Sequence, residues 1–201
     1  MAILSGHRSP RLPRLLAPTL SALLLRVVLA GGSALAQSDV SGPLEYQVKA
    51  AYLLNFTRYI EWPEAAFAGS GTPIRICVLG QDPFGSILDQ TVADQRTQGR
   101  QVMSYHLARS GQVAAQGCHV LYIGRDIRRA ASWRDPVLGR PVVTVGEGED
   151  FLEEGGMIGF VLSDETVRFA VSLPATHAAG LAISSRVLNL ATRVVPDRPG
   201  P

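Results

Sequence analysis

Short apolar runs alternate with segments of helical periodicity along the middle of this 201-residue chain. Such runs have the length of β-strands, and segments rich in glycine, proline and polar residues separate them. Strands that alternate with helices predict an α/β domain in which most strands are parallel. The expected strands are Ile74–Leu79, Gln101–Leu107, Cys118–Ile123 and Pro141–Val145. The expected helices are Glu45–Trp62, Pro83–Val92 and Asp126–Ser132.

The pattern changes toward the carboxyl end. Met157–Leu162 and Thr166–Val171 flank the short turn sequence SDE, and apolar and polar residues alternate in the second segment, which predicts an antiparallel hairpin. Apolar residues then recur at helical spacing from Pro174 to Val194, which predicts one final helix. The expected fold is therefore a single α/β domain. It has a mixed, mostly parallel central sheet layered by helices, with a C-terminal β-hairpin and a final helix.

The amino end has the order of a secretory signal peptide. Three arginines precede an apolar stretch, and Ala34-Leu35-Ala36 matches the small-residue pattern of a signal peptidase site. Removal of residues 1–36 takes away four arginines and no acid, so the formal charge changes from +2 to −2. We expect a signal peptide over 1–36, a flexible lead over 37–44, a domain over 45–195 and a disordered tail over 196–201, in a periplasmic protein.

Two cysteines, Cys77 and Cys118, remain after the signal peptide. In an oxidising compartment they can form one disulfide, whereas two buried thiols acting as small hydrophobic side chains are the alternative. The expected export favours the disulfide.

The segment ICVLGQDPFG (76–85) resembles the start of a nucleotide-binding unit but lacks its chemistry. Asp82 stands where a dinucleotide fingerprint needs its second glycine, and Gly85 is not followed by the lysine of a P-loop. We therefore interpret this segment as a strand that ends in an Asp-Pro turn and expect no bound cofactor.

Other familiar sites are also missing from the sequence pattern. His106, His119 and His177 each lack a neighbouring ligand at metal-site spacing, and no G-x-S-x-G element is present. The arginines near Arg125 are offset by Asp126, so nucleic acid is not an expected partner. An acidic cluster lacks the order of a calcium loop and is expected to be a solvated loop; it comprises Glu147, Glu149, Asp150, Glu153 and Glu154. We expect no catalytic residues and no metal site.

Five blocks of the sequence resemble the successive blocks of the YfiR/HmsC-like family. They cover essentially the whole chain after residue 45, in order, and the helix ending in EWP and the tail AGLAISSRVLNLA are the most specific. The blocks are VKAAYLLNFTRYIEWP (48–63), ICVLGQDPFG (76–85), GCHVLYIG (117–124), VVTVGEGEDFLEEGGMIGFV (142–161) and VRFAVSLPATHAAGLAISSRVLNLA (167–191).

The resemblance implies a non-enzymatic periplasmic repressor. Family members bind the periplasmic sensor domain of an inner-membrane diguanylate cyclase (a GGDEF protein), and they thereby hold down cyclic-di-GMP and biofilm formation. They dimerise and respond to redox state through cysteines, although the second cysteine pair of some members is absent here. The expected contacts with a partner are Phe169, His177 and Leu181, each of which has a core position as its alternative. A periplasmic small-solute binding protein, with a cleft at Gln81–Asp82, and an unrecognised hydrolase remain the rival hypotheses.

Overall fold

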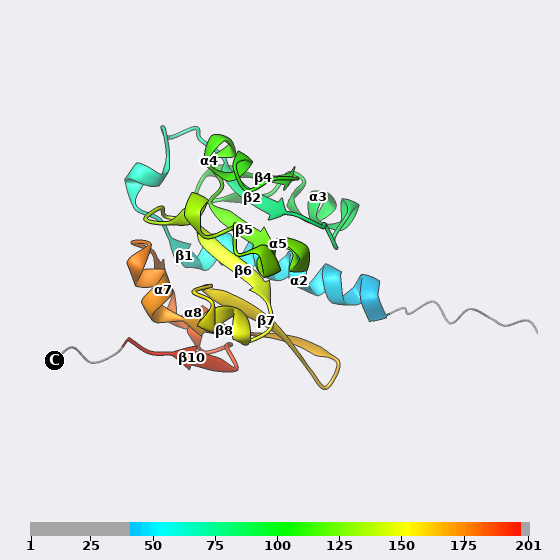
Figure 1. Cartoon of the computed structure of the whole chain (residues 1–201). Coiled ribbons are helices and arrows are strands. Elements are labelled where there is room, and N and C mark those ends of the chain that lie inside the picture. The colour runs from blue at the N-terminus through cyan, green and yellow to red at the C-terminus, as the bar shows by residue number, and fades with distance from the viewer. Residues whose placement is uncertain (1–40, 198–201) are drawn as a thin grey trace, which may run out of the picture. The chain divides into compact units, whose positions relative to one another are not determined.

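The computed structural model describes residues 41–197, and side chains from residue 44 onward. The expected signal peptide lies outside this range, as do residues 37–40 of the lead and residues 198–201 of the tail. One sheet of eight strands, in the order β10-β8-β7-β6-β5-β2-β4-β3, forms the centre (Figure 1). Its strands are β2 (Ile74–Leu79), β3 (Arg96–Thr97), β4 (Arg100–Leu107), β5 (Val120–Ile123), β6 (Val143–Glu147), β7 (Ile158–Ser163), β8 (Thr166–Ser172) and β10 (Arg193–Val195).

In the sheet, the five adjacent strands β4-β2-β5-β6-β7 are parallel to one another, as the alternating pattern predicts. Strand β8 pairs antiparallel with β7 and forms the expected hairpin, while β10 runs parallel to β8. The mixed, mostly parallel α/β sheet is therefore confirmed. A separate two-stranded sheet joins β1 (Ile60–Glu61) to β9 (Ala182–Ile183).

Helices cover both faces of the central sheet and create two apolar cores. On one face lie α2 (Ser41–Tyr59), α3 (Ser86–Val92), α7 (Leu173–Ala178) and α8 (Ser185–Leu188). On the other face lie α4 (Gln112–Gln116), α5 (Arg125–Ala130), η2 (Asp135–Val137) and α6 (Asp150–Glu153). A short 3-10 helix, η1 (Glu64–Ala66), follows β1.

The chain reverses its direction of travel across the sheet between β2 and β5. After β2 the chain passes through α3 on one face to reach β4, whereas after β5 it passes through α5 on the opposite face to reach β6. The loops that leave the carboxyl ends of these two neighbouring strands therefore diverge. Such a topological switch point leaves a crevice outside the sheet, where ligands bind in open α/β folds.

The prediction of one final helix over Pro174–Val194 is wrong. Helix α7 ends at Ala178, and Gly180 takes a left-handed φ of +68° that turns the chain. The next residues form β9 against β1, and the amide of Ser184 donates to the carbonyl of Tyr59 at 2.9 Å. Ser184 then caps the short helix α8, and β10 completes the sheet. Pairing with β1 and β8 satisfies backbone groups that a continuous helix would have satisfied internally.

The first helix also differs at both ends from its expected range of Glu45–Trp62. It begins at Ser41 and ends at Tyr59, because Ile60 and Glu61 pair with β9 before Pro63. Within residues 41–197, no helix is both long and apolar enough to cross a membrane.

Candidate functional site

The expected disulfide between Cys77 and Cys118 is confirmed. Cys77 lies in β2 and Cys118 lies two residues before the start of β5, and their Cα atoms are 5.9 Å apart. Both residues are buried in the core between the sheet and the α4–α5 layer. The bond therefore ties together the two strands on either side of the topological switch point.

Two of the three expected partner contacts are core residues. Phe169 and Leu181 are only 1% and 3% exposed, so each takes the core position that was its alternative. Both pack in the core beneath α2, α3 and α8. His177 is exposed on α7, and its Nδ1 lies 2.8 Å from Asp197 Oδ2.

An apolar pocket does give access to the ring of Phe169. It lies between α2 and α8, has a volume of about 220 Å³, and is lined mostly by aromatic and aliphatic side chains: Tyr52, Asn55, Phe56, Tyr59, Phe169, Arg186, Val187 and Leu190. The ring centroids of Tyr52 and Phe56 each lie 5.3 Å from that of Phe169. Leu190, at the edge of the pocket, is 59% exposed. We call this the α2–α8 pocket.

The pocket continues into an apolar stripe along α2. Leu44 and Val48 are exposed, and their spacing of four residues from each other and from Tyr52 places all three on one side of the helix. A contiguous exposed apolar surface beside a pocket marks a candidate site of protein–protein contact.

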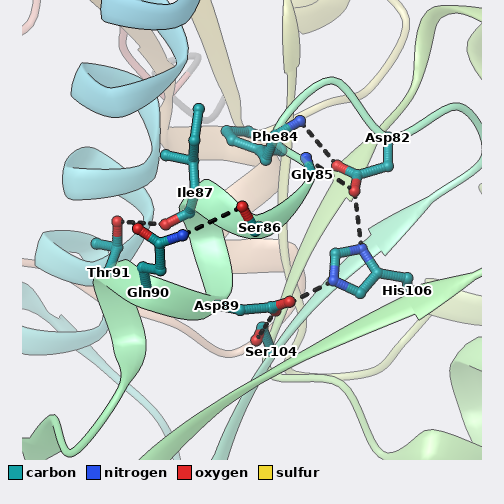
Figure 2. Close-up of polar contacts among 10 residues, drawn as sticks. All are labelled: Asp82, Phe84, Gly85, Ser86, Ile87, Asp89, Gln90, Thr91, Ser104 and His106. Carbon is teal, nitrogen blue, oxygen red and sulfur yellow. Dashed lines mark hydrogen bonds and ion pairs between the residues drawn. The ribbon is translucent and has the colours of Figure 1, made fainter.

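The turn after β2 is held by Asp82 (Figure 2). Its carboxylate accepts hydrogen bonds from the backbone amides of Phe84, at 2.8 Å, and Gly85, at 3.1 Å. These are the amides that a phosphate would need at this turn, and the carboxylate already occupies them. The structure thus agrees with the interpretation of GQDPFG as an Asp-Pro turn.

His106 on β4 connects the same turn to α3. One ring nitrogen lies 3.1 Å from Asp82 and the other lies 3.2 Å from Asp89, whose carboxylate also accepts from the hydroxyl of Ser104 at 2.5 Å (Figure 2). The bond from Ser104 is the main cause that lowers the pKa of Asp89. Since each ring nitrogen already contacts a different carboxylate, the cluster fixes α3 against β4. Within the described residues, no three His, Cys, Asp or Glu side chains gather as metal ligands would.

A buried charged network lies near the carboxyl ends of β5 and β6, and the sequence interpretation missed it. The ammonium of Lys49, which is 2% exposed, contacts both carboxylate oxygens of Glu147 at 2.7 and 2.8 Å, and it also binds Glu45. The hydroxyl of Tyr122 donates to Glu147 at 2.7 Å. Burial and the adjacent carboxylate both raise the pKa of Tyr122, so this hydroxyl keeps its proton.

Part of the acidic cluster differs from the solvated loop that was expected. Glu147 ends β6 and is buried, while Asp150 begins the short helix α6. The guanidinium of Arg128 binds Asp150 and Glu154, each at 2.7 Å, and these bonds are the main cause that lowers the pKa of both carboxyl groups. The sequence did contain one signal for the burial of Glu147. It was a lone lysine, Lys49, within an otherwise apolar stretch of helix.

Comparisons with solved structures identify only distant similarity. A conserved domain protein from Vibrio cholerae O1 biovar eltor aligns with 60% of this chain and 54% of its own, at 12% identity and a TM-score of 0.43. An ABC domain from Streptococcus pneumonia, solved in complex with L-Trp, aligns with 61% of this chain and 56% of its own, at 11% identity and a TM-score of 0.46. This chain thus spans little more than half the length of either protein.

The family comparison is more extensive. None of the curated proteins compared with the sequence matches it significantly. A family model described as YfiR/HmsC-like matches residues 46–192, which includes every strand of the central sheet except β10. The match extends from α2, through the disulfide and the switch point, to the residues after α8. The chain belongs to the YfiR/HmsC-like family.

Proposed function

We propose that this protein is a periplasmic repressor of an inner-membrane diguanylate cyclase. It binds the periplasmic sensor domain of the cyclase and thereby lowers cyclic-di-GMP and biofilm formation. Membership of the YfiR/HmsC-like family supports this regulatory, non-catalytic role. The disulfide supports an oxidising compartment, because such bonds rarely persist in the cytosol.

The observation that carries a binding function is the surface formed by the α2–α8 pocket and the α2 stripe. Leu44, Val48 and Leu190 are exposed next to a pocket with a floor of aromatic rings. An apolar side chain of a partner would fill that pocket and remove the leucines from water. Binding energy at this surface comes from apolar area, because Arg186 is the one charged residue among those that line the α2–α8 pocket.

The proposal includes cleavage after Ala36 and a homodimer as the working form. Amino-terminal sequencing of the exported protein would show Gln37 as its first residue, and a retained Met1 would contradict the proposed cleavage. Sedimentation at several concentrations would distinguish the dimer from a monomer.

The repressor function is tested by deleting the gene in a strain that expresses the cognate cyclase. We expect the deletion to raise cyclic-di-GMP and surface attachment, and we expect no effect when the cyclase gene is also absent. Unchanged cyclic-di-GMP in the single deletion, with both proteins demonstrably expressed, would contradict the repressor function.

A further inference from the structure

The switch point between β2 and β5 carries a polar crevice made of two adjoining cavities. One has a volume of about 200 Å³ and is lined by Tyr46, Gln81, Pro83, Tyr122, Gly124 and Arg125. The other has a volume of about 380 Å³ and is lined by Arg125, Arg128, Arg129, Glu147, Gly148, Asp150 and Glu154. Arg125 lines both cavities. The crevice thus lies where the fold itself predicts a ligand site.

The walls of the crevice are held in place by close backbone packing. A side-chain carbon on Gly124 would lie 2.7 Å from Asp126 Oδ1 and 2.9 Å from the carbonyl oxygen of Leu79, so only glycine fits there. Gly80 has a φ of +87°, and a side-chain carbon there would lie 2.6 Å from the same Asp126 oxygen. That oxygen accepts the amide of Gln81 at 3.0 Å. Asp126 therefore joins the two diverging loops and fixes the mouth of the crevice before any ligand arrives.

Some charged side chains of the crevice form ion pairs with one another, and others do not. Glu147 contacts Lys49, and Asp150 and Glu154 share the single guanidinium of Arg128. Arg125 and Arg129 are exposed, and the guanidinium of neither forms a salt bridge or hydrogen bond within residues 44–197. Two guanidinium groups thus remain to bind a ligand, and each offers a planar set of donors suited to a carboxylate or phosphate.

Neutral donors and acceptors stand beside these cations. Tyr46 and Gln81 line the smaller cavity, and within the described part of the chain neither the hydroxyl of Tyr46 nor the side-chain amide of Gln81 forms a hydrogen bond. The floor is formed by Tyr122 and Glu147, which belong to the buried network of Lys49. A buried charged network beneath an open polar cavity is costly to maintain and typical of a functional site.

We propose that this crevice is a binding site for a small organic anion. The anionic group, a carboxylate or a phosphate, binds Arg125 and Arg129, and a hydroxyl or carbonyl of the same molecule contacts Tyr46 and Gln81. The site lies at the carboxyl ends of β2, β5 and β6. It is independent of the proposed repressor function, because the isolated protein would bind such an anion whether or not a cyclase is its partner.

The test uses the purified protein and two probes, inorganic phosphate and succinate, with uncharged glycerol as a control. Two-dimensional NMR follows the backbone amides during titration at low ionic strength. We expect at least one probe to produce saturable shifts at Gln81, Gly124 and Arg125. Saturation by phosphate alone assigns the site to phosphate-bearing ligands, and saturation by succinate alone assigns it to carboxylates.

Variants locate the binding energy. R125A and R129A should each weaken binding roughly tenfold or more, the loss expected for a charge-assisted hydrogen bond. The control is R140A, because Arg140 is also exposed but precedes β6, at the opposite end of that strand. All three spectra should retain the dispersion of the folded protein. Shifts that never saturate with either probe, or an equal loss in R140A, would overturn the proposal and leave only non-specific attraction between anions and surface arginines.

Discussion

Lys49 and Glu147 form a buried ion pair across 98 positions of sequence. Lys49 lies within α2 and Glu147 ends β6, so the contact joins the first helix to the carboxyl edge of the sheet. The Lys49 Nζ lies 2.7 Å from Glu147 Oε2, and the side chains are 2% and 10% exposed. Because both charges are removed from water, loss of either partner leaves the other buried and uncompensated.

Replacing Lys49 with methionine is therefore expected to destabilise the protein by about 3–5 kcal/mol, because it leaves Glu147 buried without its cation. Urea unfolding followed by circular dichroism measures the change. The matched control is the double variant K49M/E147Q, which removes both charges and should recover a large part of the loss. If the double variant is as unstable as K49M, the cost comes from packing rather than from the unpaired charge.

The disulfide between Cys77 and Cys118 spans 41 positions. On the chain-entropy estimate, a closed loop of this length stabilises the native state by roughly 4 kcal/mol. We expect reduction with a thiol reagent to lower the melting temperature of the wild-type protein. A C77A/C118A variant serves as the control, since the same reagent should leave its melting temperature unchanged. Two free thiols in denatured, non-reduced protein would contradict the bond.

Burial lowers the pKa of His119 from 6.5 to about 4. The ring is 3% exposed, stacks on Phe67 and accepts the amide of Arg75 at Nδ1, 3.2 Å away. Because the folded state holds this histidine neutral, its contribution to stability is complete above pH 6.5. This contribution is lost as the pH falls from 6.5 to about 4, because over this interval the histidine binds a proton in the unfolded chain but not in the folded one.

The loss over this interval amounts to about 3 kcal/mol from a shift of this size. Unfolding free energies measured at half-unit steps of pH should therefore fall between pH 6.5 and 4. The variant H119N keeps an acceptor for the Arg75 amide but does not titrate, so its curve should be flatter over the same interval. Parallel curves for the two proteins would show that other groups cause the acid sensitivity.

Local sequence patterns predicted the elements that the order of apolar and polar residues is enough to identify. The runs that became β2, β5 and β6 are apolar on both faces because helices cover both sides of the sheet. The hairpin could be predicted because residues such as Val167 and Phe169 alternate with exposed ones around a two-residue turn. These features need no knowledge of distant segments.

The features that the sequence did not reveal depend on distant partners. Residues 182–183 form a strand only because β1 lies beside them, and an apolar spacing that suits a helix also suits this broken segment. Glu147 resembled a loop acid because its cation, Lys49, comes from the other end of the domain. A cleft at Gln81–Asp82 was among the sequence hypotheses, but the presence of Arg125 on its other side depends on strand order, which periodicity alone does not determine.

The α2–α8 pocket is the proposed surface for the cyclase. Leu190 lies at its edge and is 59% exposed, so L190D places a charge in the proposed interface without disturbing the core. We expect binding to the periplasmic domain of the cyclase to weaken by about 2 kcal/mol or more, because a charge must be desolvated where an apolar contact was buried. The free energy of unfolding should change by no more than about 0.5 kcal/mol.

The control is L138D, because Leu138 is 82% exposed and follows η2 on the opposite face of the sheet. Affinity is measured with purified proteins, and cyclic-di-GMP is measured in a deletion strain that carries each variant. L190D should release the cyclase while L138D represses it as the wild type does. Full repression by L190D would exclude this pocket from the interface, and equal failure of both variants at unchanged stability would indicate that charge on any exposed leucine interferes with binding.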